Sequence, residues 1–165
     1  MDKAITSDFK FISYKVDDLE LKVIRNIDIL AFSGYIDPSL WEFNVAILHP
    51  LFLQAKNIYI GGVSCNLYLF PKDLEKNKKT PENALIFLKA SISGAFRIEG
   101  KQFDSDTEQQ LIKLRIPSIL FPYLRATITS LLANSGFGSI VLPLINMNAI
   151  AEKMLEKMEV KVIPA

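Results

Sequence analysis

The stretch that most constrains the fold runs from Ser118 to Asn146 and carries a single charged residue, Arg125. Pro122 fits the first turn of a helix, where the earliest N–H groups have no partner to lose. Residues 134–136 (Asn-Ser-Gly) are typical of a helix end, because glycine adopts the left-handed cap conformation at little cost. The pattern predicts a helix that is apolar almost all round and must be covered on more than one side. We expect part of that cover to come from another copy of the chain.

A second helix is predicted beyond an extended linker, with Asn146 as its N-terminal cap. Its apolar residues recur at helical spacing, while its charged residues occupy the opposite side. The apolar set is Met147, Ile150, Ala151, Met154, Leu155 and Met158, and the charged set is Glu152, Lys153, Glu156 and Lys157. Prolines, glycines and the arginine interrupt the apolar stretch at spacings that disfavour a membrane-spanning helix.

The upstream part of the chain has the patterns of β-strands. Residues 9–23 end in an alternation of apolar and charged residues, which predicts a strand with one buried and one solvent-facing side. The apolar members of this alternation are Leu19, Leu21 and Val23. Residues 43–53 are apolar but contain Pro50, which predicts an edge strand or a bulged one. Residues 57–70 and 84–98 flank a charged loop and predict a long antiparallel hairpin.

Together these elements predict one domain over residues 1–165, a length that suits a single core. Residues 24–42 are expected to form a crossover loop that carries Trp41. Residues 104–114 are expected to form a short helix with an acidic cap. Because the strands precede the helices, the chain is predicted to be α+β, with the helices on one face of an antiparallel sheet.

Composition limits the class of protein. Half of the residues are hydrophobic, and an apolar excess without a membrane span indicates subunit contacts or an exposed binding surface. The 19 basic and 18 acidic residues nearly cancel, so no nucleic-acid partner is expected. The single cysteine fits a reducing, cytoplasmic compartment. The N-terminus lacks the apolar core of a secretory signal.

Residues suited to catalysis or to metal binding are few. His49 lies in an apolar run with no cysteine or carboxylate at ligand spacing, and Cys65 lies within a strand. Residues 136–138 (Gly-Phe-Gly) lack the third glycine of a dinucleotide-binding motif. We therefore expect no enzyme activity, no metal and no cofactor.

Apolar surface remains to be explained. The first helix has more apolar residues than one small sheet face covers: Phe121, Leu124, Ile128, Leu131 and Leu132. One interpretation is that all of them belong to the core or to a subunit interface. The other is a hydrophobic groove between helix, linker and sheet that binds extended, unfolded chains through a strand edge and apolar pockets.

The first helix also carries a recognisable motif. Residues 119–123 (Ile-Leu-Phe-Pro-Tyr), followed by Arg125, Ile128, Leu131, Gly136, Phe137 and Asn146, closely resemble the C-terminal signature of SecB, the bacterial export chaperone. Further upstream, residues 87–88 and 94–98 resemble the fourth strand of that family. Its first strand and its crossover-loop tryptophan are matched by Phe9, Phe11, Asp18, Leu19 and Trp41.

The resemblance implies a four-stranded antiparallel sheet with two antiparallel C-terminal helices on one face. It also implies a cytoplasmic homotetramer, a dimer of dimers, that acts as an ATP-independent holdase for unfolded polypeptides or preproteins. We predict that the client-binding groove is lined by Trp41, Phe121, Leu124, Ile128, Leu142 and Leu144.

The resemblance has departures that concern the export motor SecA. In the family, acidic residues on the exposed sheet face bind SecA, and Asp18 matches one of them. Lys22 and Lys89 occupy positions where the family has glutamates. Reversed charges weaken attraction to a basic partner. A dedicated chaperone or adaptor for one partner, such as an antitoxin, without SecA coupling, is therefore the alternative function.

Overall fold

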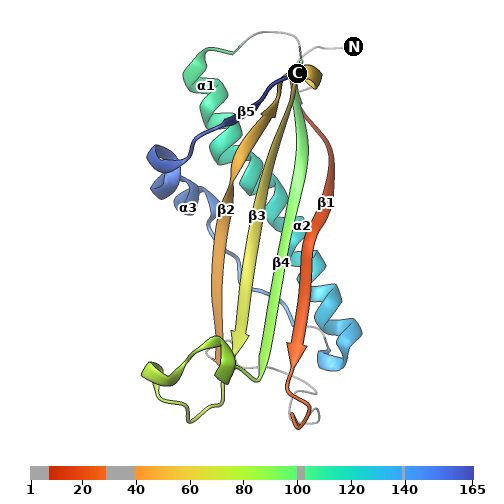
Figure 1. The fold of residues 1–165 in the computed structure, drawn as a ribbon, viewed down its shortest axis with the longest axis vertical. Coiled ribbons are helices and arrows are strands. Elements are labelled where there is room, and N and C mark those ends of the chain that lie inside the picture. The colour runs from red at the N-terminus through yellow and green to blue at the C-terminus, as the bar shows by residue number, and fades with distance from the viewer. Residues whose placement is uncertain (1–7, 29–39, 100–102, 139) are drawn as a thin grey trace.

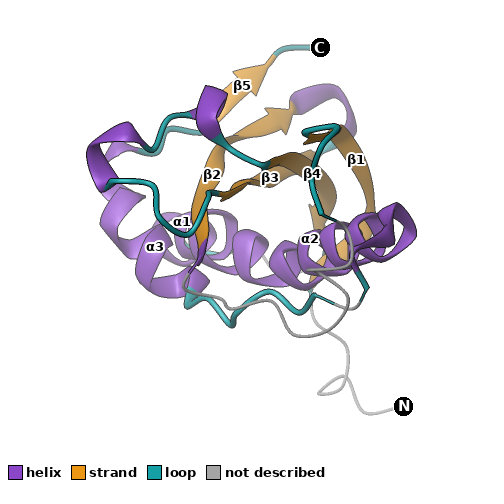
Figure 2. Ribbon diagram, turned by 90° about the horizontal axis from the view of Figure 1, so that it is seen from below, coloured by secondary structure: helices purple, strands orange, loops and turns teal. Residues whose placement is uncertain are grey.

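The computed structural model describes residues 8–28, 40–99, 103–138 and 140–165. Over these residues the chain forms two layers, a sheet and a helical layer on one of its faces (Figures 1 and 2). The strands are β1 (Phe9–Val23), β2 (Trp41–Leu53), β3 (Ile58–Leu69), β4 (Ile86–Ile98) and β5 (Lys161–Ile163). The helices are α1 (Ser105–Gln110), α2 (Ile116–Leu132) and α3 (Met147–Met154). The predicted α+β class is confirmed.

The prediction of a four-stranded, purely antiparallel sheet is wrong. Within the described residues, the strand order is β1-β4-β3-β2-β5, and β5 pairs with β2 in parallel while the other pairs are antiparallel. The sheet is therefore mixed. A three-residue strand is too short to show an alternating pattern in the sequence, so β5 could not be predicted from periodicity.

The predicted hairpin is formed by β3 and β4, which pair in continuous register from Tyr59 opposite Phe96 to Leu69 opposite Ile86. Pro50 has the predicted effect on β2, because the register with β3 shifts between Leu48 and Leu51. Trp41 is predicted to lie in a crossover loop, but in the structure it is the first residue of β2. Residues 29–39 of the predicted loop lie outside the described residues.

Helix α2 crosses the sheet diagonally and packs on β3 and β4 (Figure 1). It begins earlier than predicted, since Pro117 rather than Pro122 lies in its first turn and Pro122 is inside the helix. An internal proline removes one backbone hydrogen bond. The helix continues because the residues around Pro122, including Leu120, Phe121 and Leu124, are buried against the sheet. Tertiary packing here outweighs local preference.

The helix ends follow the predicted rules. Gly136 has a φ of 91° and stands in the turn Ala133–Phe137 that follows α2. The Asn146 side chain accepts a hydrogen bond of 3.1 Å from the Ala149 N–H and so caps α3. Asp104 caps α1 in the same way, through the Thr107 N–H at 2.9 Å.

Two glycines determine how closely α2 lies on the sheet. A Cβ atom on Gly61 of β3 would overlap the side chain of Ile116, and one on Gly94 of β4 would overlap Leu120. Gly61 and Gly94 are paired across the two strands. Their missing side chains leave room on the sheet for Ile116 and Leu120 of α2.

Candidate functional site

Five of the six predicted groove residues are buried in this chain. Phe121, Leu124 and Ile128 lie on the sheet-facing side of α2, where Leu124 and Ile128 are completely covered. Trp41 and Leu142 are also buried, whereas Leu144 is 87% exposed. The structure therefore places the first five in the core between sheet, helix and linker, and only Leu144 on the surface. Their role in client binding stays a prediction.

The linker between α2 and α3 is held against α2 by Arg125. The Arg125 Nη2 atom donates a hydrogen bond of 3.0 Å to the carbonyl oxygen of Leu142. Leu142 points into the core, whereas its neighbour Val141 is 71% exposed. We call Val141 and Leu144 the linker surface. They are the two most exposed large hydrophobic residues among those that the structure describes.

A second apolar surface follows β1, an edge strand of the sheet. Its members are between 36% and 48% exposed, and we call them the edge-strand surface: Ile12, Tyr14, Val16, Leu19 and Val23. The prediction that Leu19 and Val23 lie on a buried side of the strand is wrong, because α2 contacts β3 and β4 and leaves β1 partly uncovered. An edge position cannot be read from alternation alone.

A shallow cleft separates β1 from the C-terminal half of α2. Its volume is about 410 Å³, and it is lined by Tyr14, Leu19, Ala126, Thr127, Ser130, Leu131 and Asn134. The Tyr14 ring packs on Tyr123 of α2 with 4.5 Å between ring centroids. The cleft is continuous with the edge-strand surface, because Tyr14 and Leu19 belong to both.

Charges on the sheet face away from α2 are paired. Lys89 of β4 lies 2.6 Å from Asp18 of β1, and Lys22 lies 2.8 Å from Glu20. The hydrogen bond that the Lys89 ammonium donates to the Asp18 carboxylate raises the pKa of Lys89. A third lysine, Lys15, pairs with Asp17. These exposed pairs add little stability, but they cancel the negative charge that β1 would otherwise present.

Two polar side chains of the core, Cys65 and Tyr59, have raised pKa values. Cys65 is 2% exposed in β3, and burial raises the pKa of its thiol to about 11, so the thiol is inert at neutral pH. Tyr59 donates a hydrogen bond to Glu108 of α1, and burial together with this carboxylate raises its pKa. Among the described residues, no three acidic, histidine or cysteine side chains cluster as metal ligands would.

A two-layer α+β fold with a long apolar helix on one sheet face and apolar residues exposed at the sheet edge and on the linker defines a SecB-like class of protein. Residues 54–158 match the family model described as preprotein translocase subunit SecB. Because the match includes more than half of the chain, the chain belongs to the SecB family.

Relatives support this assignment. The protein-export protein SecB of Saccharophagus degradans is 40% identical over 101 residues, which is 59% of this chain and 57% of the relative. That of Dichelobacter nodosus is 28% identical over 143 residues, with 86% of this chain and 82% of the relative covered. The chain thus spans little more than half the length of the first relative.

A solved structure has a similar fold. The SecB-like chaperone of Mycobacterium tuberculosis, in complex with a ChAD peptide from the HigA1 antitoxin, has a TM-score of 0.51. The match covers 83% of this chain and 90% of that one, at 12% sequence identity. At this identity the likeness concerns the fold alone.

Proposed function

We propose that the chain is an ATP-independent holdase that binds non-native polypeptides through apolar surface, in a homo-oligomer built on the edge-strand surface. Membership of the SecB family supports a chaperone role in protein export. The observation that carries the proposal is the linker surface, where Val141 and Leu144 are 71% and 87% exposed. Isolated apolar residues are common on protein surfaces, but two on one short, anchored linker form a site that apolar side chains of a client can contact.

The buried residues have a supporting role in this proposal. Leu142 fixes the linker in the core, while Arg125 holds its backbone, so that the residues on either side of Leu142 point outward. Trp41, Phe121, Leu124 and Ile128 would then form the floor beneath the linker. Affinity without sequence selectivity is expected, because apolar contacts and strand pairing do not read particular side chains.

The proposal is tested by light scattering of the purified protein with a reduced, slowly folding polypeptide. We expect suppressed aggregation of the client and a complex that contains it. Replacing Val141 and Leu144 by serine should weaken client binding by about tenfold, since two exposed apolar side chains account for roughly 1–2 kcal/mol. The matched control, Ile24→Ser, removes an apolar side chain that is 36% exposed and belongs neither to the linker surface nor to β5. Aggregation that proceeds unchanged with the wild-type protein would disprove the holdase function.

Charge pairing favours a second candidate, a chaperone for a dedicated partner without SecA coupling. Asp18, the predicted SecA contact, is already engaged by Lys89. A basic patch on a partner would meet lysines together with carboxylates, and such mixed charge lowers the association rate. The SecB-like chaperone of similar fold was solved with an antitoxin peptide. An antitoxin peptide is therefore the kind of dedicated partner to test. Isothermal titration that detects tight binding of SecA to the wild-type chain would contradict this candidate.

A further inference from the structure

One edge of the sheet is covered along only part of its length. Strand β2 pairs with β3 on one side. On the other side, β5 pairs with Leu51–Leu53, and no other described strand pairs with residues 41–48. The backbone groups of an open strand edge can pair with any extended chain. β5 therefore occupies one end of a potential binding edge.

β5 is held loosely compared with the strand on which it lies. It has three residues, of which Lys161 and Val162 are exposed, with Val162 at 55%. Phe52 of β2 is the partner of Val162, and its ring stacks on the Tyr59 ring of β3 with 4.5 Å between ring centroids. Short strands with exposed side chains open at low free energy. The rigid member of this pair is therefore β2, and the removable member is β5.

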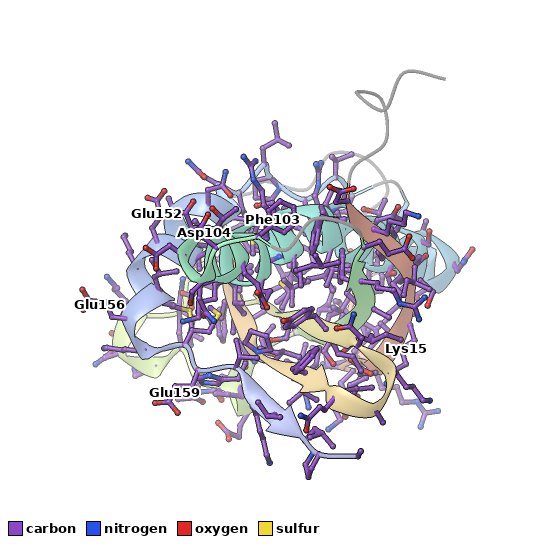
Figure 3. The ribbon with its side chains drawn as sticks, turned by 90° about the horizontal axis from the view of Figure 1, so that it is seen from above. Lys15, Phe103, Asp104, Glu152, Glu156 and Glu159 are labelled. Carbon is purple, nitrogen blue, oxygen red and sulfur yellow. The ribbon has the colours of Figure 1, made fainter. Side chains whose placement is uncertain are left out.

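The anchor of β5 lies just before it. Met158 is 2% exposed and fixes the end of the helical region in the core. The Glu159 N–H then donates a long hydrogen bond of 3.4 Å to Nδ1 of His49 on β2. Figure 3 shows Glu159 near one edge of the sheet and Lys15 of β1 at the other edge. Val160 is partly buried against the core, but the last fully buried side chain is Met158. Residues 161–163 can therefore leave the sheet while Met158 and Val160 stay in place.

We infer that β5 is an internal competitor of the client, a displaceable strand that pairs with the β2 edge and gives way when an extended polypeptide pairs there. This inference rests on the proposed holdase function and describes how its binding edge is regulated. A site that is blocked in part of the molecules binds with an affinity reduced by the open fraction. If β5 is paired in about nine molecules of ten, releasing it raises client affinity about tenfold.

Two variants test the competition in opposite directions. Val162→Pro removes a backbone donor from β5 and should release it, whereas the matched control Val162→Thr keeps a β-branched residue and the donor. In Leu51→Cys/Lys161→Cys, a disulfide between paired residues locks β5 onto β2. Cys65 is buried and takes no part in that bond. The probe is fluorescently labelled, reduced and carboxymethylated α-lactalbumin, and the readout is its equilibrium affinity.

We expect Val162→Pro to bind about tenfold more tightly, Val162→Thr to bind as the wild type does, and the oxidised double variant to bind more weakly until it is reduced. Hydrogen exchange at residues 51–53 verifies that β5 has been released. The competition would be overturned if the proline variant released β5 without a change in client affinity, or if the locked variant bound the client as tightly as the wild type. Either result would leave the holdase function standing. Absence of client binding in every form would overturn both. If the proline variant does not fold, the disulfide variant decides alone.

Discussion

Glycine at position 61 shows how one residue determines the distance between the two layers. The side chain of Ile116 occupies the space that a Cβ atom on Gly61 would need. Ile116 is completely buried at the start of α2, so it cannot turn away into solvent. An interior without free volume resists even one added methyl group.

Gly61→Ala is therefore expected to lower the free energy of unfolding by about 1–3 kcal/mol, because α2 must move or Ile116 must change its rotamer. The measurement is urea denaturation followed by circular dichroism. The control is a double-mutant cycle with Ile116→Ala, which removes the overlapping atoms. The cost of Gly61→Ala should fall in that background. An equal cost in both backgrounds would show that the overlap is not its cause.

At the scale of elements, Arg125 makes the polar contact that joins the linker to α2. Arg125 donates to the Leu142 carbonyl from a partly buried position. Hydrogen bonds from a charged donor are stronger than those between neutral groups. The hydrogen bond from Arg125 should stabilise the docked linker by about 1.5–3 kcal/mol. We therefore expect Arg125→Ala to raise the rate of amide hydrogen exchange across residues 140–145 about tenfold or more.

Two further variants interpret that result. Arg125→Lys keeps a charged donor and should restore part of the protection. Arg115→Ala changes an exposed arginine just before α2 and should leave the linker unaffected. Equal exchange rates in Arg125→Ala and in the wild type would show that the buried side chain of Leu142, and not the hydrogen bond from Arg125, keeps the linker docked on α2.

The elements were more predictable from the sequence than their mutual positions were. Asn146 and Gly136 mark helix ends through local hydrogen bonding and backbone conformation, which are properties of a few adjacent residues. Pro122 suggested a helix start, but the helix runs through it because the residues around it are buried against strands that are distant in the sequence. The groove residues were chosen by helical spacing, which identifies an apolar face but not what covers it. Exposure of Val141 and Leu144 depends on where the linker is held, so periodicity could not reveal which linker residues face solvent.

At the scale of the whole molecule, the two sheet edges differ. The β2 edge carries β5 at one end, whereas β1 has no strand beyond it among the described residues. β1 also has register shifts on either side of residues 13–16, and such bulges often limit pairing at an edge. The exposed apolar side chains on β1, together with the cleft beside α2, favour packing of a second copy against this edge. This is the cover that the apolar first helix is expected to need.

If the proposed oligomer forms through the β1 edge, Val16→Lys combined with Leu19→Lys should lower its molar mass, because each lysine would have to be desolvated in an apolar interface. The two residues are 44% and 43% exposed in the single chain, so the folded subunit itself should tolerate them. Molar mass by light scattering after gel filtration is the measurement. Leu48→Lys is the matched control, since Leu48 is 37% exposed on β2, away from β1. A double-lysine variant with the mass of the wild type, alongside a smaller Leu48→Lys species, would place the subunit contact on the β2 side. In that case the contact would overlap the edge occupied by β5, and client pairing there would have to compete with assembly as well as with β5.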